Sequence, residues 1–299
     1  MLPSVERLLK GIFDYAGLFP PASLDLAEAV ERYLRYRGGT DAWIMSRLVC
    51  SSAKLGLLTE VLAKQSPRTP IQVTVAGRPS RSRETWEAAL EQDVKDMNAF
   101  LASAGEFADI EAYEVRVPDH DDTAAYLRDL NGFRDVEVYV ELPWAVGLDD
   151  ALAFLSESDW LGAKGRTGGT DAAAFPAADQ LAGFLSSCVA LEVPFKLTAG
   201  LHHPFPTWDA ATGAQAHGFM SVLGTTALAL AEDLSRSQMS QALQSPAEDW
   251  TFSETSISWR GNEAPIQAID QARDLFVAIG SCSIDEPLDD LASEGLITK

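Results

Sequence analysis

Short apolar runs alternate along this chain with longer segments in which apolar residues recur at helical spacing. In the run 136–143, β-branched and aromatic residues alternate, as is typical of a strand. After Ser23, a candidate N-cap, apolar positions follow at helical spacing until Gly38 ends the pattern. The predicted strands are 11–19, 42–50, 71–77, 110–118, 136–143, the two short runs around Lys164 and Lys196, and 250–259. The predicted helices are 23–38, 53–64, 83–104, 122–130, 148–156, 179–191, 217–234 and 264–279.

Strand-then-helix units in regular alternation predict a parallel sheet. Eight such units, without a linker or a shift in composition between them, predict an α/β protein with a single-domain (β/α)8 TIM barrel over 1–299. An open doubly wound sheet is the competing fold, but no glycine-rich dinucleotide fingerprint follows the first strand. Ser283 and Glu286, followed by Pro287, resemble a capping box and predict a short C-terminal helical extension at about 283–299.

The charge balance narrows the range of partners. The chain has 299 residues and a formal net charge of −21, so neither a nucleic acid nor an anionic membrane surface is expected to bind it. Three widely separated cysteines without metal-type spacing indicate a reducing compartment. No signal peptide and no apolar run of spanning length is visible, so we expect a cytoplasmic location.

Two lysines occupy an unusual position, inside consecutive strand-like runs. Lys164 lies in Ala163-Lys164-Gly165-Arg166-Thr167-Gly168-Gly169, and Lys196 lies in Phe195-Lys196-Leu197-Thr198-Ala199-Gly200-Leu201-His202-His203. Because desolvating an ammonium costs several kcal/mol without a partner, a lysine inside a strand is either ion-paired or kept for chemistry. Each run ends in small residues and glycine soon after its lysine, and this favours the second alternative, a lysine kept for chemistry.

The carboxyl ends of barrel strands are where the reactive groups of such folds lie. Lys164 and Arg166 share one face of their strand, as do Lys196 and Thr198 of the next. For so acidic a protein the strand ends are rich in cations, which predicts a small anionic substrate, a phosphate or a carboxylate. Trp144 and Trp208 follow strands and are candidates for a pocket wall. The strand-end candidates are Asp14, Arg47, Cys50, Glu114, Arg116, Glu141, Lys164, Arg166, Thr167, Lys196, Thr198, His202, His203, Glu254 and Arg260.

A lysine among other cations and apolar walls can have a lowered pKa, and its neutral amine can then attack a carbonyl to form a Schiff base. A second lysine disfavours the charged form of the first, and a carboxylate moves protons. Glu141 and Glu114 are the available carboxylates. The alternatives are that both lysines form structural ion pairs with Glu141 and Glu114, or that they only bind an anion.

These two phrases resemble those of the deoxyribose-phosphate aldolases. Lys164-Gly165-Arg166-Thr167-Gly168 resembles the K-x-x-T-G phrase on their sixth strand, and Lys196-Leu197-Thr198-Ala199-Gly200 resembles the K-x-x-G-G phrase on their seventh. The resemblance is confined to 160–204 and implies that Lys164 forms the Schiff base while Lys196 lowers its pKa. Ala199 replaces a glycine of that pattern, and His202-His203 has no counterpart there. The phrases at 17–21 and 280–283 resemble those of a bacterial TIM-barrel family, which implies no particular activity.

The sequence therefore predicts a class I aldolase-type lyase acting on a small anionic carbonyl compound, without a cofactor. The first rival is a metal-assisted lyase or hydrolase, with His202, His203 and Glu141 as fallback ligands beside Asp14. The second is a barrel that binds an anionic metabolite without turnover. A homodimer is a possible assembly. The predicted catalytic residues are Lys164, Lys196, Glu141 and Glu114, and the predicted substrate-binding residues are Arg47, Arg166, Thr167, Thr198, His202, His203 and Asp14.

Overall fold

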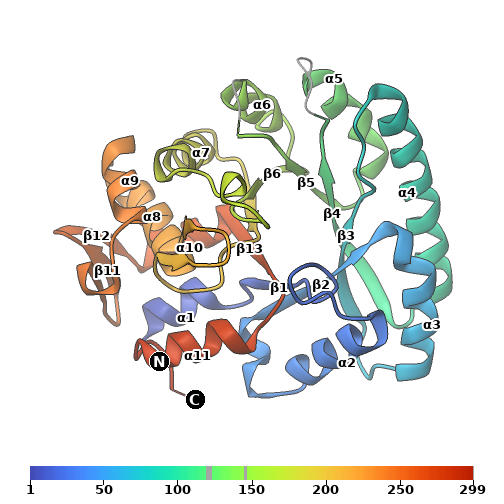
Figure 1. The fold of residues 1–299 in the computed structure, drawn as a ribbon, viewed down its shortest axis with the longest axis horizontal. Helices are drawn as coiled ribbons and strands as arrows, with labels where there is room; N and C mark the ends of the chain where they lie inside the picture. Colours follow the sequence, from blue (N-terminus) through green and yellow to red (C-terminus); the bar gives the residue numbers. More distant parts are fainter. Residues whose placement is uncertain (119–122, 145–146, 299) are drawn as a thin grey trace.

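Eight parallel strands close into a ring, and helices surround them (Figure 1). The computed structural model describes residues 1–118, 123–144 and 147–298. The strands follow each other around the ring in chain order, and the last pairs with the first, so the ring has no open edge. The predicted single-domain (β/α)8 barrel is thereby confirmed. The barrel strands are β1 Phe13–Tyr15, β2 Met45–Ser51, β3 Ile71–Ala76, β4 Ala108–Arg116, β5 Glu137–Glu141, β6 Leu161–Arg166, β7 Phe195–Thr198 and β13 Phe276–Ser281.

The helices between these strands form the outer layer. They are α2 Leu26–Arg37, α3 Leu55–Gln65, α4 Arg83–Ala104, α5 Thr123–Arg128, α6 Leu148–Leu155, α7 Ala178–Ala190, α8 Phe219–Ala231 and α10 Ile266–Leu275. Asp122, where the fourth helix was predicted to begin, lies outside the described residues. The additional helices are α1 Pro3–Leu9, α9 Arg236–Leu243 and α11 Asp285–Ser293, and short 3-10 turns lie at Thr40–Ile44, Ser52–Lys54, Asp129–Phe133, Ala172–Ala174 and Ala247–Asp249.

Helix α2 shows how the sequence places this outer layer. Its N-cap is Asp25, whose side chain accepts the backbone N–H of Glu28, and not Ser23 as the pattern predicted. Ser23 has a φ of +45° and belongs to the preceding turn. The apolar stripe of the helix, which includes Val30 and Tyr33, is fully buried, and the Tyr33 hydroxyl donates to the Ser46 carbonyl of β2.

The eighth barrel strand differs from the prediction. The run 250–259 was expected to close the barrel, but it forms β10 Trp250–Phe252 and β11 Ser256–Trp259, which pair antiparallel with β12 Asn262–Pro265 outside the ring. The predicted helix 264–279 ends at Leu275, and β13 follows directly and pairs with β1 and β7. No glycine or proline separates the helix from β13, so only the pairing with two distant strands reveals the boundary. Glu254 and Arg260 consequently lie outside the barrel.

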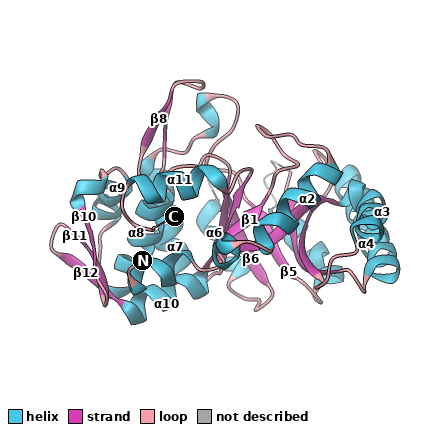
Figure 2. Cartoon of the chain, turned by 90° about the horizontal axis from the view of Figure 1, so that it is seen from below, coloured by secondary structure: helices cyan, strands magenta, loops and turns pink. Residues whose placement is uncertain are grey.

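A small hairpin follows β7 and stands at the carboxyl end of the barrel. It consists of β8 Thr207–Asp209 and β9 Ala214–Ala216, and Figure 2 shows it projecting beyond the main body of the molecule. Helix α11 is the predicted terminal helix, where the Ser283 hydroxyl accepts the backbone N–H of Glu286. Lys299, the end of the predicted extension, lies outside the described residues.

Apolar side chains fill the space between strands and helices. Phe195 of β7 stacks on Phe276 of β13 with ring centroids 4.7 Å apart, and Phe184 of α7 meets Phe195 edge to face. This packing ties the closing strand to its neighbour. Within the described part of the chain, no helix combines the length and the apolar character needed to cross a membrane.

Candidate active site

A cavity of about 860 Å³ opens at the carboxyl ends of the barrel strands. Its floor contains Lys164 and Glu114, and Arg166 and Thr198 line it beside them. His202 and the β8–β9 hairpin contribute to its outer part. In a (β/α)8 barrel this face is where reactive groups gather, because the loops that follow all the strands meet there.

Lys164 lies between two carboxylates at the floor of this cavity. Its Nζ is 2.8 Å from Oε2 of Glu114 and 2.9 Å from Oε2 of Glu141. The parallel register places Glu141, Lys164 and Lys196 side by side on β5, β6 and β7. The Lys164 side chain is 13% exposed and lines the cavity, so this residue combines two ion pairs with contact to the cavity.

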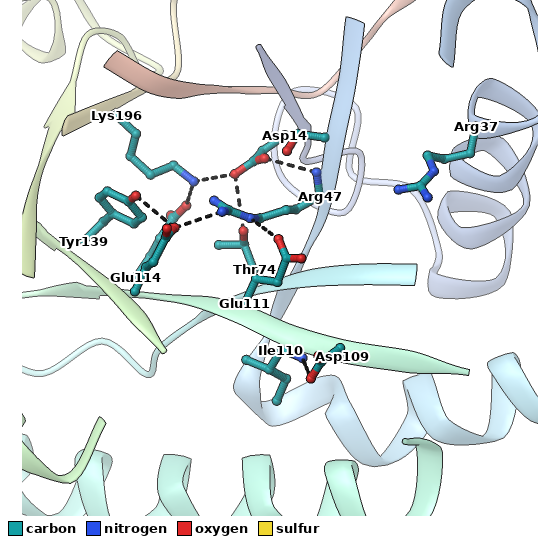
Figure 3. A network of polar contacts seen from close by, with 12 residues as sticks. Asp14, Arg37, Arg47, Thr74, Asp109, Ile110, Glu111, Glu114, Tyr139 and Lys196 are labelled. Atoms are coloured by element: carbon teal, nitrogen blue, oxygen red, sulfur yellow. Dashed lines mark hydrogen bonds and ion pairs between the residues drawn. The ribbon is translucent and has the colours of Figure 1, made fainter. Parts of the chain in front are cut away.

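Lys196 lies deeper in the barrel and is completely buried. Its Nζ is 2.5 Å from Oδ2 of Asp14, contacts Oε1 of Glu114 and lies 5.5 Å from the centre of the Tyr139 ring (Figure 3). Glu114 therefore bridges the two lysines, one with each carboxylate oxygen. Asp14 also accepts hydrogen bonds from the Thr74 hydroxyl and the Arg47 backbone N–H, as Figure 3 shows. The structure thus places Asp14 below the cavity, where it pairs with Lys196.

The charges of this cluster hold one another in place. Burial by itself lowers the pKa of Lys164, but the attraction of Glu114 and Glu141 outweighs it and raises that pKa above its usual value. Burial raises the pKa of Glu114, but Lys164 and Lys196 together lower it to about 2. For Glu141 the same balance, with Lys164 and Arg166 as the cations, leaves a lowered pKa. The expected lowering of the Lys164 pKa is therefore reversed, because its nearest charged neighbours are carboxylates and not Lys196.

Arg166, Thr167 and Thr198 have three different environments. Arg166 is about half exposed in the cavity, with Nε 3.5 Å from Oε1 of Glu141. Thr167 is buried and donates to the Ala199 carbonyl at 2.5 Å, so it joins two loops and does not line the cavity. Thr198 lines the cavity, and its hydroxyl is buried without a hydrogen-bond partner among the described residues. Of these three predicted binding residues, Arg166 and Thr198 therefore line the cavity and Thr167 does not.

Arg47 was expected to hold the anionic end of the substrate, but it lies away from the cavity. Its guanidinium pairs with Glu111 at 2.9 Å and with Glu137 at 2.8 Å. Glu137 is the first residue of β5, so this cluster is nearer the amino ends of the strands. A sequence pattern places Arg47 on a strand but cannot tell how far along the barrel axis its long side chain reaches.

The two histidines after β7 both line the cavity, and each faces a carboxylate of α11. Nδ1 of His203 is 2.5 Å from Oδ2 of Asp290. Nδ1 of His202 is 3.3 Å from Oε2 of Glu286, which is ion-pair range without hydrogen-bond geometry. Glu141 pairs with Lys164 and not with these histidines. Among the described residues, no three His, Cys, Asp or Glu side chains are grouped so that they could hold a metal ion.

The loops that follow β6 and β7 touch through glycine. A Cβ on Gly168 would lie 2.6 Å from the Cα of Gly200, and Gly200 has a φ of +76°. Ala199, where the resemblance has glycine, also has a positive φ of +63°. This close approach brings the segments that carry Arg166 and Thr198 together.

Sequence reasoning missed most of the cavity wall. Phe19, Pro20 and Pro21 line it from the loop after β1, and Phe175 lines it from the loop after β6. Phe19, Pro20 and Pro21 belong to the phrase 17–21, whose resemblance implied no particular activity, and the sequence signal of Phe175 is apolar character in a loop. Trp208, a candidate wall residue, does line the cavity. Trp144 instead donates its indole N–H to the Arg166 carbonyl at 2.7 Å.

Among solved structures, the chain is similar to a monomeric variant of dihydrodipicolinate synthase, with 14% sequence identity, a TM-score of 0.39 and 79% of each chain covered. No protein-family model matches the chain. No curated protein matches its sequence. A likeness this distant transfers neither an activity nor a site residue, so the function has to follow from the geometry of the cavity.

Proposed function

We propose that the protein is a class I aldolase-type lyase in which Lys164 forms a Schiff base with a small carbonyl compound that carries an anionic group. One observation carries the proposal. The Lys164 side chain is 13% exposed at the floor of an 860 Å³ cavity, and its ammonium has carboxylate oxygens 2.8 and 2.9 Å from it. A lysine that served only as a structural ion pair would have no need of that opening.

Glu141 is the better proton acceptor of the two carboxylates. Glu114 is held by two lysines, and its pKa of about 2 keeps it ionised. Glu141 has one close lysine partner, Lys164, while the Nε atoms of Arg166 and Arg116 lie 3.5 and 4.0 Å from its other carboxylate oxygen. Transfer of one proton from Lys164 Nζ to Glu141 gives the neutral amine that attacks the carbonyl carbon. The resulting carbinolamine loses water, with the proton returned by Glu141, and an iminium ion remains.

The ion pairs that raise the pKa of Lys164 also favour this product. An iminium nitrogen carries the same positive charge as the ammonium, so Glu114 and Glu141 stabilise both species. The iminium ion withdraws electrons from the neighbouring carbon–carbon bond, which then breaks or forms. Lys196 is a positioning residue here, because it fixes Glu114 and shares the negative charge that would otherwise act on Lys164 alone.

Arg166 and Thr198 are the proposed anion-binding groups. Arg166 lies at the same carboxylate as Lys164, so an anion that it binds sits close to the imine carbon. Thr198 lines the cavity, and its hydroxyl, buried just behind that wall, has no hydrogen-bond partner among the described residues. The class of carbonyl compound that fits is one whose carboxylate or other anionic group is near its carbonyl.

Borohydride trapping tests this proposal directly. The protein is incubated with aldehydes, ketones and keto acids, reduced, digested and analysed by peptide mass. We expect an adduct on Lys164 that is lost in Lys164→Ala and retained in Lys95→Ala, which removes an exposed lysine of α4. An adduct on Lys196 instead would contradict the assigned roles. Tight binding of a keto acid without any lysine adduct would overturn the lyase and support the binding-only barrel.

A further inference from the structure

The cavity is larger than its reactive floor requires. Lys164, Glu114 and Arg166 occupy one end, while the volume of about 860 Å³ is within the range of sites that enclose a drug-sized molecule. A three-carbon keto acid placed on Lys164 would leave most of this space to water. The outer part of the cavity therefore needs an occupant of its own.

The walls of this outer part are apolar and aromatic. Phe19, Pro20 and Pro21 come from the loop after β1, Phe175 from the loop after β6 and Trp208 from the β8–β9 hairpin. Trp208 is 63% exposed, the largest exposed fraction among the large apolar side chains of the described residues. An indole in a cavity wall is a surface on which a flat apolar group gains both burial and ring contact.

The charged groups of the outer part are mainly acidic. Asp209 and Glu286 line the cavity, and Asp290 lies behind His203. Each histidine there faces a carboxylate of α11, so neither ring is left without an acidic neighbour. The lysine and arginine side chains of the cavity, Lys164 and Arg166, both lie at Glu141 on the floor. A second anionic group on a substrate would therefore meet like charge in the outer part.

We infer that the substrate is an extended carbonyl acid with a flat, uncharged apolar tail that lies against Trp208, and that it carries no second anionic group at the far end. This inference rests on the proposed function, because it takes the carbonyl carbon to be at Lys164. It departs from a phosphorylated sugar, the substrate class implied by the resemblance of the two lysine phrases, because among the described residues no lysine or arginine lines the outer part, where a phosphate would lie.

Trapping can be used to compare three 2-keto acids: pyruvate, phenylpyruvate and an acid of phenylpyruvate length that ends in a phosphonate. The quantity measured is the concentration that gives half-maximal Lys164 adduct. We expect it to be about five- to tenfold lower for phenylpyruvate than for pyruvate, since an aromatic contact contributes about that much. The phosphonate should be the poorest of the three. Trp208→Ala should remove the advantage of phenylpyruvate and leave pyruvate unchanged, whereas Leu57→Ala, a truncation of an exposed apolar residue on α3, should change neither.

Equal values for pyruvate and phenylpyruvate, or an equal loss for both in Trp208→Ala, would overturn the inference while the imine chemistry stands. If no keto acid forms an adduct with Lys164, the proposed function fails. Calorimetry then tests separately whether the outer part of the cavity binds an apolar tail. In that measurement, 3-phenylpropionate should bind at least fivefold more tightly than propionate, and Trp208→Ala should abolish the difference. Equal affinities of the two acids would exclude an apolar tail site.

Discussion

Oε2 of Glu141 lies 2.9 Å from Nζ of Lys164, and the other oxygen of the same carboxylate faces Arg166. An ammonium and a carboxylate at this distance can exchange a proton without solvent. The neutral pair that results has the same number of protons as the ion pair, so its population does not depend on pH between the two pKa values.

The first prediction concerns that proton. Because the pKa of Glu141 is lowered and that of Lys164 is raised, the rate of adduct formation should be nearly independent of pH over about pH 6 to 9. In Glu141→Gln the proton has to leave to solvent, and the rate should then rise about tenfold per pH unit. Rates of adduct formation with saturating cyanoborohydride provide the measurement, and Glu114→Gln is the matched control, expected to stay flat. A wild-type rate that already rises with pH, with the same slope in Glu141→Gln, would remove Glu141 from the mechanism.

The second prediction concerns the buried pair of Lys196 and Asp14. Replacing Lys196 with Met leaves the Asp14 carboxylate buried with only the Thr74 hydroxyl and a backbone N–H as partners. Removing one member of a buried pair costs about 3–5 kcal/mol, so the free energy of unfolding should fall by that order. The double variant Lys196→Met/Asp14→Asn should recover part of the loss, because no charge is left unpaired. Urea denaturation of the wild type, Lys196→Met, Asp14→Asn and the double variant checks this. If the losses of the two single variants simply add in the double variant, the two residues are not coupled.

The third prediction is the effect of acid on the bridging carboxylate Glu114. Its pKa in the folded protein is about 2, below the ordinary 4.5, so its contribution to stability is present above about pH 4.5 and is lost as the pH falls toward 2. The lowered pKa of Glu114 corresponds to about 3 kcal/mol of stability. In Glu114→Gln this contribution is absent at every pH. The difference in unfolding free energy between wild type and Glu114→Gln should therefore shrink between pH 4.5 and 2, and a difference that stays constant would contradict the lowered pKa.

The fourth prediction concerns the contact between the loops after β6 and β7. Gly168→Ala would place a methyl group 2.6 Å from the Cα of Gly200, and a backbone neighbour cannot rotate away. We expect a loss of about 1–3 kcal/mol in unfolding free energy and weaker keto-acid binding, because the loops must separate. Gly56→Ala in α3 is the control, since no described atom outside its chain neighbours and its own helix backbone lies within 4 Å of the new methyl group, and it should not destabilise the protein. Equal stability of the two variants would mean that the loops adjust without cost.

Parts of the site followed from local sequence, and parts did not. The phrases around Lys164 and Lys196 marked two neighbouring strands, which the structure places side by side as β6 and β7. The partners of these lysines come from other strands, Glu141 from the adjacent β5, Glu114 from β4 and Asp14 from β1. The sequence named Glu114 and Glu141 without indicating which lysine each of them contacts. Asp14 lies 182 positions from Lys196 along the chain, so its contact with that lysine was not visible.

The sequence by itself determined the barrel class and the placement of Lys164 and Lys196 on consecutive strands, because strand and helix periodicities and the lysine phrases are local properties of the chain. Tertiary structure decided which segment closes the ring. The sequence of β13 continues the helical pattern of α10, and its pairing with β1 and β7 is what makes it a strand. It also decided whether the pKa of Lys164 is raised or lowered and which carboxylates Arg47 contacts, because both depend on which charges lie within a few ångströms. Such distances are set by the closing of the barrel, which brings residues from its whole length to one axis.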